Sequence, residues 1–194
     1  MSKSQRIFLI GGPPGCGKGT LIQGLFGKGN DAHIVPMSGL LNEATAHHLY
    51  GPIIEKCMDD GSLVPTEIIC EIFRDYCDKL QFIEQDLVLD GVIRTRMQAK
   101  EIIKSIKETI PVSQIKEMIS IEIKVPLEVC KERMLGRGRS DDKDSVIENR
   151  FDYYKAFTQD AINSLSWVTG CRSITINGLQ SPEQVLEEAK RILG

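Results

Sequence analysis

The hydrophobic positions of this chain form short apolar runs separated by longer segments with helical spacing. Runs of this kind, bounded by turn residues, are typical of strands that are buried on both faces of a parallel sheet, and the longer segments suit the helices that connect such strands. We therefore predict an α/β fold with a five-stranded parallel sheet. The predicted strands are residues 6–10, 33–35, 87–89, 119–125 and 173–176.

Helical periodicity fills most of the chain between these runs. The last predicted helix has the clearest beginning, because Ser181 can act as the cap, Pro182 fits the first helical position and Gln184 completes a capping box. The glycines at 51 and 61 bracket a short helix and indicate a small helical insertion. The predicted helices are residues 18–25, 40–48, 53–60, 67–82, 96–108, 127–135, 142–165 and 182–193.

Size and charge change this picture little. A chain of 194 residues with 41% hydrophobic residues can bury one sizeable core, so we predict a single domain over residues 1–194. The formal net charge of -3 gives no general attraction for nucleic acid or for an anionic membrane, so we expect neither as a partner. Any site for a polyanion must be local.

The cysteines and the N-terminal segment bear on the compartment. The six cysteines include no C-x-x-C pair and no zinc-finger spacing with histidine, which favours reduced thiols in the cytosol. The apolar stretch at residues 7–10 is too short for a signal peptide or a membrane span. We expect a cytoplasmic protein, with a monomer as the default.

The strongest chemical motif is GPPGCGKGT at residues 12–20, between the first strand and the first helix. Glycines let successive backbone N–H groups face one anion, the helix N-terminus adds a partial positive charge, and Lys18 can reach the outer phosphates of a nucleoside triphosphate. Thr20 stands one place later than the usual hydroxyl, which favours phosphate contact over Mg²⁺ ligation. The other residues expected at the phosphates are Gly12, Gly15, Cys16, Gly17 and Gly19, with Cys16 as a small filler.

This motif resembles the G-x-P-G-x-G-K-G-T phosphate loop of adenylate kinases, and the similarity continues along nearly the whole chain. GSLVP at 61–65 resembles the G-x-L-V-P segment, which implies that Leu63 and Val64 lie against the acceptor base. DGVIRT at 90–95 with Gln98 resembles D-G-F/Y-P-R-T-x-x-Q. In that motif the arginine, here Arg94 beside Gly91, holds the acceptor phosphate, and the glutamine reads adenine.

The resemblance extends to the second half of the chain. Arg137, Arg139 and the aspartates at 141–142, followed by Arg150, are similar to the family's lid arginines, paired aspartates and next-helix arginine. The resemblance further places Asn177 and Gly178 beside the donor adenine, and Arg133 is a further candidate for binding the donor nucleotide. It implies the three-layer P-loop NTPase fold, with strand order 2-3-1-4-5 and helices on both faces. It also implies an acceptor-binding insertion at about 37–66 and a short lid at about 136–141.

Several of these residues can be interpreted without the family. Asp90 ends a buried strand beside the phosphate loop, where it can hold Mg²⁺ through water, and the alternative is a cap for the next helix. The forks of Arg137, Arg139 and Arg150 match phosphate oxygens, whereas Arg133 could equally cover the surface. Asp142, Arg150 and Tyr154 share a helical face, which predicts an ion pair between Asp142 and Arg150, with Ser140 as the helix cap.

The amide and imidazole side chains complete the candidates. Gln98 can read adenine because an amide offers both a donor and an acceptor, and the alternative is a solvated glutamine on a helix. His47 and His48 are assigned to the surface or a helix end, since phosphoryl transfer needs little proton chemistry from the protein.

The chain also departs from the family pattern at the acceptor side. Asn42 stands where the family carries an arginine against the acceptor phosphate, Met37 replaces a threonine near the acceptor base, and Ile93 replaces the proline before Arg94. These changes bear on the affinity for the acceptor and on its identity.

The sequence therefore predicts reversible transfer of a phosphoryl group from MgATP to AMP, giving two ADP. Lys18 and the loop would hold ATP with Mg²⁺, Arg94 and Arg150 would hold the acceptor, and Arg137 and Arg139 would close over the transferring group. Two alternatives stay open: a kinase for another nucleoside monophosphate of the UMP/CMP type, and a nucleotide-binding sensor with weakened catalysis.

Overall fold

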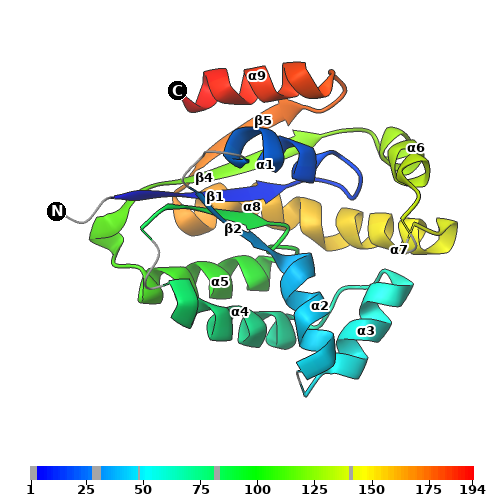
Figure 1. Cartoon of the computed structure of the whole chain (residues 1–194), viewed down its shortest axis with the longest axis horizontal. Helices are drawn as coiled ribbons and strands as arrows, with labels where there is room; N and C mark the ends of the chain where they lie inside the picture. Colours follow the sequence, from blue (N-terminus) through cyan, green and yellow to red (C-terminus); the bar gives the residue numbers. More distant parts are fainter. Residues whose placement is uncertain (1–3, 28–31, 48, 81–83, 140–141) are drawn as a thin grey trace.

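The computed structural model describes residues 4–27, 32–47, 49–80, 84–139 and 142–194. Its strands form one parallel sheet in the order β2-β3-β1-β4-β5 (Figure 1). The predicted α/β class and strand order are confirmed. The strands are β1 (Gln5–Gly11), β2 (Ala32–Pro36), β3 (Asp86–Asp90), β4 (Ile115–Lys124) and β5 (Arg172–Asn177).

Helices connect the strands and cover both faces of the sheet. They are α1 (Lys18–Phe26), α2 (Met37–His47), α3 (Gly51–Asp60), α4 (Thr66–Leu80), α5 (Arg96–Thr109), α6 (Leu127–Arg137), α7 (Asp144–Tyr153), α8 (Gln159–Thr169) and α9 (Pro182–Leu193), with a 3₁₀ turn at Val112–Gln114 and a π turn at Tyr154–Thr158. The prediction for α9 is confirmed to the residue, with the capping box between Ser181 and Gln184 in place.

The predicted single helix at 142–165 is wrong in two respects. The helix begins at Asp144, and a π turn divides it into α7 and α8. Ser140, the expected cap, lies outside the described residues, and Lys143 precedes the first helical residue without a side-chain cap.

The core has two halves, one on each face of the sheet. Ile7 and Leu9 of β1 pack with α4, α5 and α8, while Phe8 and Ile10 pack with α1, α6 and α9 (Figure 1). Alternate side chains of a strand point to opposite faces, so a central strand between two helical layers must be apolar at every position. This is why the first apolar run in the sequence is continuous.

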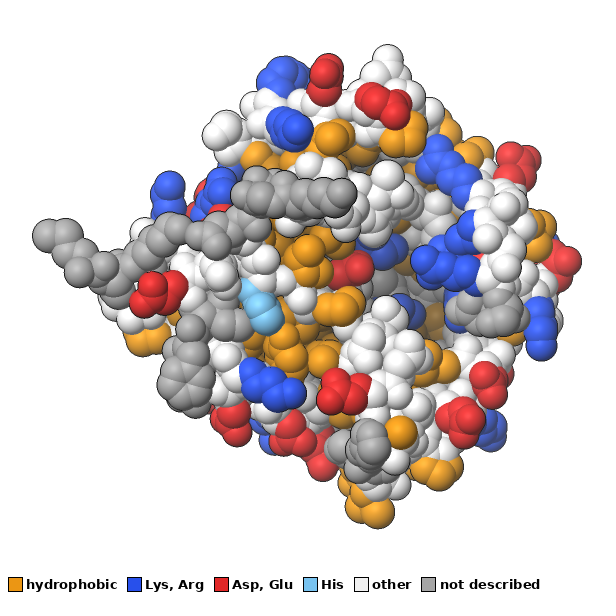
Figure 2. Space-filling model, in the orientation of Figure 1, with side chains coloured by type: hydrophobic (Ala, Val, Ile, Leu, Met, Phe, Trp, Pro, Cys, Tyr) orange, Lys and Arg blue, Asp and Glu red, His pale blue; other side chains and the backbone are white. Residues whose placement is uncertain are grey.

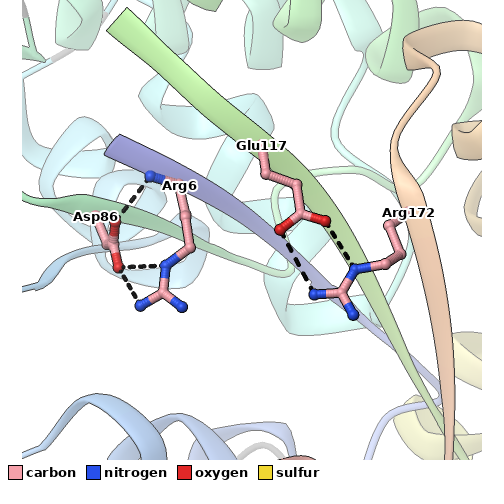
Figure 3. Close-up of polar contacts among 4 residues, drawn as sticks. All are labelled: Arg6, Asp86, Glu117 and Arg172. Atoms are coloured by element: carbon pink, nitrogen blue, oxygen red, sulfur yellow. Dashed lines mark hydrogen bonds and ion pairs between the residues drawn. The ribbon is translucent and has the colours of Figure 1, made fainter. Parts of the chain in front are cut away.

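Ion pairs join neighbouring strands at their amino ends (Figure 3). The guanidinium of Arg6 on β1 donates to Asp86 on β3 at 2.7 and 2.9 Å, and Arg172 on β5 donates to Glu117 on β4 at 2.7 Å. These partly exposed pairs contribute about 1 kcal/mol at most, so they act mainly on register. The carboxyl ends of the strands lie at the other edge, towards α2 and α3 (Figure 1).

Within the described part of the chain, every helix is too short or too polar to cross a bilayer.

Candidate active site

A cleft of about 1080 Å³ opens at the carboxyl ends of the central strands. Binding sites of open parallel α/β sheets are found at this edge. Figure 2 shows Lys and Arg side chains gathered around a hollow on this face. The basic residues that line the cleft are Lys18, Arg94, Arg133, Arg137, Arg139 and Arg150. Among the described lining residues the carboxylates are Asp90 and Glu183, so the cleft is positive although the chain as a whole is acidic.

The phosphate loop connects β1 to α1 in a conformation that requires glycine. Gly12, Gly15 and Gly17 have φ angles of 142°, 83° and 100°. A Cβ at Gly12 would lie 2.7 Å from a carbonyl oxygen of β4, and one at Gly15 would lie 2.6 Å from a carbonyl oxygen of α6. Lys18 Nζ donates to the carbonyls of Gly12 and Pro13 at 3.0 and 3.1 Å. The lysine therefore lies across the loop, with its ammonium facing the cleft from α1.

Cys16 is buried under this loop at 3% exposure, as expected for a small filler. Gly19 and Thr20 follow on the first turn of α1 and line the cleft. The loop thus presents backbone and hydroxyl groups on the same side as the ammonium of Lys18.

Asp90 closes β3 beside the loop and lines the cleft. Burial raises the pKa of this carboxyl, and the positive charges of Lys18 and Arg94 partly oppose the rise. The alternative role as a helix cap is wrong, because Thr95 caps α5 by accepting the Gln98 N–H at 3.1 Å. The charges of Lys18 and Arg94 thus offset the burial of Asp90 only in part, and its carboxylate can also provide an oxygen ligand that suits Mg²⁺.

Side chains from two elements anchor the main chain of Arg94. Its N–H donates to Gln98 Oε1 at 2.8 Å, and its carbonyl accepts from Thr158 Oγ1 at 3.1 Å. The guanidinium lines the cleft, and its pKa lies below the usual value because the surrounding protein desolvates it and Arg150 is nearby. The guanidinium groups of Arg94 and Arg150 are thus held near each other by the fold itself.

Gln98 is 2% exposed and lines the cleft, so the alternative of a solvated helix glutamine is wrong. Its oxygen is engaged by the N–H of Arg94, however, which the sequence did not indicate. The groups that it can offer to a base are the N–H donors of the amide, rather than a donor and an acceptor together.

Asp142 organises the arginines on the lid side. Arg137 donates to both of its oxygens, at 2.5 and 2.8 Å, and Arg150 Nη1 lies 3.8 Å from Oδ1. The carboxylate is 1% exposed, and the hydrogen bonds from Arg137 hold its pKa below the usual range. The predicted ion pair with Arg150 is present, but the principal partner is Arg137. Arg139 is exposed and also lines the cleft; Asp141 lies outside the described residues.

The donor-side candidates divide into two groups. Arg133 lines the cleft and donates to the Gly178 carbonyl at 2.9 Å, so it does more than cover the surface of α6. Asn177 accepts the Leu179 N–H at 3.1 Å, and neither Asn177 nor Gly178 is among the described residues that line the cleft. The first turn of α9 lines it instead, through Pro182 and Glu183.

The acceptor side has an apolar wall. Its described members include Met37, Leu41, Cys57, Met58, Leu63, Val64, Ile69 and Ile93. Met37, Leu63 and Val64, which the resemblance assigned to the acceptor side, are among these lining residues. Asn42 is exposed on α2 and is outside the described lining. His48 and the side chain of His47 lie outside the described residues.

The end of α7 and the π turn supply site residues that the sequence did not single out. They are Tyr153, the last residue of α7, and Thr158, the last residue of the π turn, and both line the cleft. Tyr154 between them also lines the cleft, and burial raises the pKa of its hydroxyl. Thr158 stands four residues after Tyr154 and eight after Arg150, so helical periodicity from Arg150 was the available indication of its position.

Comparisons with known proteins agree on one family. Residues 10–167 match the family model described as adenylate kinase. The adenylate kinase of Nautilia profundicola is 30% identical over 97% of this chain and 96% of the relative. Adenylate kinase 1 of a Nostoc species is 31% identical over 97% of each chain, and the adenylate kinase of Prochlorococcus marinus is 32% identical over 98% of this chain and 99% of the relative.

Proposed function

This chain belongs to the adenylate kinase family, and from that premise we propose that it transfers the γ-phosphoryl group of MgATP to AMP, giving two ADP in a reversible reaction. The observation that carries the proposal is the convergence of six cations on one cleft beside the phosphate loop and Asp90. A triphosphate and a monophosphate together bring several negative charges, and a cleft of this sign and size suits them.

We assign the basic residues according to the elements that carry them. Lys18 and the loop amides hold the donor phosphates, with Arg133 on the donor side. Arg94 and Arg150 hold the acceptor phosphate, and Arg137 and Arg139 reach the transferring group from the lid. Catalysis arises from in-line positioning and from neutralising charge in the transition state, because phosphoryl transfer leaves little covalent chemistry for the protein.

Asp90 and Thr20 fit a role in holding Mg²⁺. Both offer oxygen, both line the cleft beside the loop, and burial disfavours the charge of Asp90 without a cation. Held there by Asp90 and Thr20, Mg²⁺ would neutralise part of the phosphate charge. Mg²⁺ commonly keeps several waters and takes one or two carboxylates, which suits a single aspartate acting through water.

The remaining assignments extend the same proposal. Residues at about 37–66 form the acceptor clamp and those at about 136–141 a minimal lid, within one domain. We also propose a monomeric cytoplasmic enzyme in which the six cysteines stay reduced; all six lie among the described residues, and none of them forms a disulfide.

A coupled assay with a panel of acceptors tests the function. With saturating MgATP, AMP should exceed CMP and UMP in kcat/KM by tenfold or more, since a buried amide left without its partner penalises the wrong base by about 1–3 kcal/mol. The Lys18→Ala variant serves as the inactive control and should fold normally. Equal rates with the three monophosphates would refute adenine selection, and no turnover with any of them would favour a nucleotide-binding sensor.

A further inference from the structure

The π turn at Tyr154–Thr158 interrupts what would otherwise be one long helix from α7 to α8. Turns of this type are rare, occur mostly as single bulges within α-helices and are frequent at functional sites. Here the turn ends with Thr158, which is 9% exposed, lines the cleft and donates its hydroxyl to the Arg94 carbonyl at 3.1 Å. The bulge thus coincides with a polar contact to the segment that carries Arg94.

The segment that receives this contact has little support from regular structure. Residues 92–95 lie between β3 and α5 and belong to neither element. Both backbone groups of Arg94 are instead held by side chains, the N–H by Gln98 on α5 and the carbonyl by Thr158 on the π turn. A backbone segment in a cleft needs such partners, because unpaired buried polar groups are costly.

Holding the backbone of Arg94 matters because the surroundings of its guanidinium disfavour the positive charge. Desolvation and, after it, the positive charge of Arg150 lower the pKa of Arg94, while the negative charge of Asp90 opposes this shift. Arg150 and Thr158 belong to the same continuous run of helical turns, so this run carries one acceptor arginine and restrains the backbone of the other. A displacement of about 1 Å in a positioning contact can reduce turnover about a hundredfold.

We propose that Thr158 is a positioning residue: its hydroxyl holds the Arg94 carbonyl and thereby fixes the Arg94 guanidinium against the acceptor phosphate. This inference rests on the proposed function, because it assigns the acceptor phosphate to Arg94. Under the competing view, Thr158 only packs the interior between α8 and the sheet. That view predicts a change in stability without a selective change in acceptor binding.

The test compares Thr158→Val, Thr158→Ala and Thr158→Ser with Thr109→Val. Valine removes the hydroxyl while keeping the volume, alanine provides a variant without extra bulk if valine folds poorly, and serine restores the hydroxyl. Thr109→Val is the matched control, since Thr109 Oγ1 also donates to a backbone carbonyl, that of Ser105, at 2.9 Å at the far end of α5. Thermal unfolding of each variant verifies the fold.

For Thr158→Val and Thr158→Ala we expect the KM for AMP to rise about five- to tenfold with the KM for ATP nearly unchanged, which is the effect of losing one hydrogen bond. Thr158→Ser should restore the value, and Thr109→Val should behave as the wild type. Calorimetric titration of AMP should show the same loss of affinity without depending on turnover.

A wild-type enzyme that phosphorylates AMP, together with unchanged AMP affinity in both folded variants, would overturn the role of Thr158 and leave the function standing. Wild type that binds AMP but does not phosphorylate it would overturn the function, and the titrations would still decide the role of Thr158.

Discussion

Asp90 carries a charge in a place that disfavours it. Burial raises its pKa, so the ionised form weakens the folded state as the pH rises from the unfolded value of about 3.9 through the raised folded value. A buried carboxylate of this kind lowers the free energy of unfolding, which is expected where the charge is needed for ligand binding.

We expect Asp90→Asn to have a higher Tm than the wild type at neutral pH and a kcat lower by about a hundredfold or more. The Tm difference should grow as the pH rises from about 4 and then level off, because asparagine has no charge to bury. Thermal scans from pH 4 to 8 without nucleotide, together with the coupled assay, measure both effects. A Tm difference that is independent of pH would contradict this account.

Asn42 raises a different question at the residue scale. It is exposed on α2 and lies outside the described lining of the cleft, although its neighbour Leu41 lines it. We expect Asn42→Arg to lower the KM for AMP about tenfold or more with little change for ATP, since a charge-assisted hydrogen bond contributes about 1.5–3 kcal/mol. Titrating AMP at saturating MgATP measures this KM. The Asn42→Lys variant adds the same charge without a planar guanidinium and serves as a comparison. An unchanged or raised KM for AMP would show that this side has been remodelled.

The cations of the site could be predicted from the sequence, whereas some of their partners could not. Lys18, Arg94 and Arg150 follow from motifs with fixed spacing. The bidentate contact of Arg137 with Asp142 depends on a loop that precedes α7, where helical periodicity does not apply. Gln98 lines the cleft, but its side-chain oxygen accepts the N–H of Arg94. The residue type alone does not indicate that this oxygen is already hydrogen-bonded.

At the scale of elements, Gly61 is the point where the end of α3 meets α7. It ends α3 with a φ of 78°, and a Cβ there would lie 2.7 Å from the Val146 carbonyl oxygen and 3.2 Å from Arg150 Cγ. Both the conformation and the contact therefore require glycine.

We expect Gly61→Ala to cost at least about 1–2 kcal/mol, which lowers the Tm by roughly 2–8 °C. It should also raise the KM for AMP, because the added methyl group presses on Arg150. Gly136→Ala is the matched control: it lies within α6, has no neighbour within 4 Å of the added Cβ, and should stabilise by about 0.5–1 kcal/mol. A Gly61→Ala protein as stable as the wild type would mean that α3 and α7 separate easily at this contact.

Sequence periodicity located every strand and nearly every helix, because two-sided burial leaves a continuous apolar run and one-sided burial leaves a helical stripe. It could not distinguish the π turn, since Arg150, Tyr154 and Thr158 keep a spacing of four that an α-helix shares. The start of β4 was also missed. Ile115–Met118 lies at the edge of the core with polar residues interspersed, so its apolar pattern is weaker than that of the buried centre.

The whole molecule concentrates positive charge at one place while its net charge is negative. Folding brings these cations together, so an anion with several oxygens should stabilise the folded state by relieving their repulsion. A ligand at a hundred times its Kd adds about 2.7 kcal/mol, which corresponds to roughly 5–10 °C for a chain of this size.

We therefore expect tripolyphosphate to raise the Tm by several degrees over sodium chloride at equal ionic strength. Lys18→Ala should reduce this rise, and Lys104→Ala, which removes an exposed lysine on α5 away from the cleft, should not. If sodium chloride and tripolyphosphate changed the Tm equally, the cations of the cleft would not form a single binding site for a polyanion.

The order of the strands has a consequence for biosynthesis. β1 is the central strand, yet Ile7 pairs with Leu87 on β3 and with Met118 on β4. At 5–20 residues per second a ribosome needs roughly 5–20 s to make the chain between β1 and β4. Until β3 is made, β1 has neither of its neighbours, and until β4 is made it has only one. Distant pairings of this kind also form slowly. The nascent chain is thus most exposed to aggregation and to chaperones before β4 is complete.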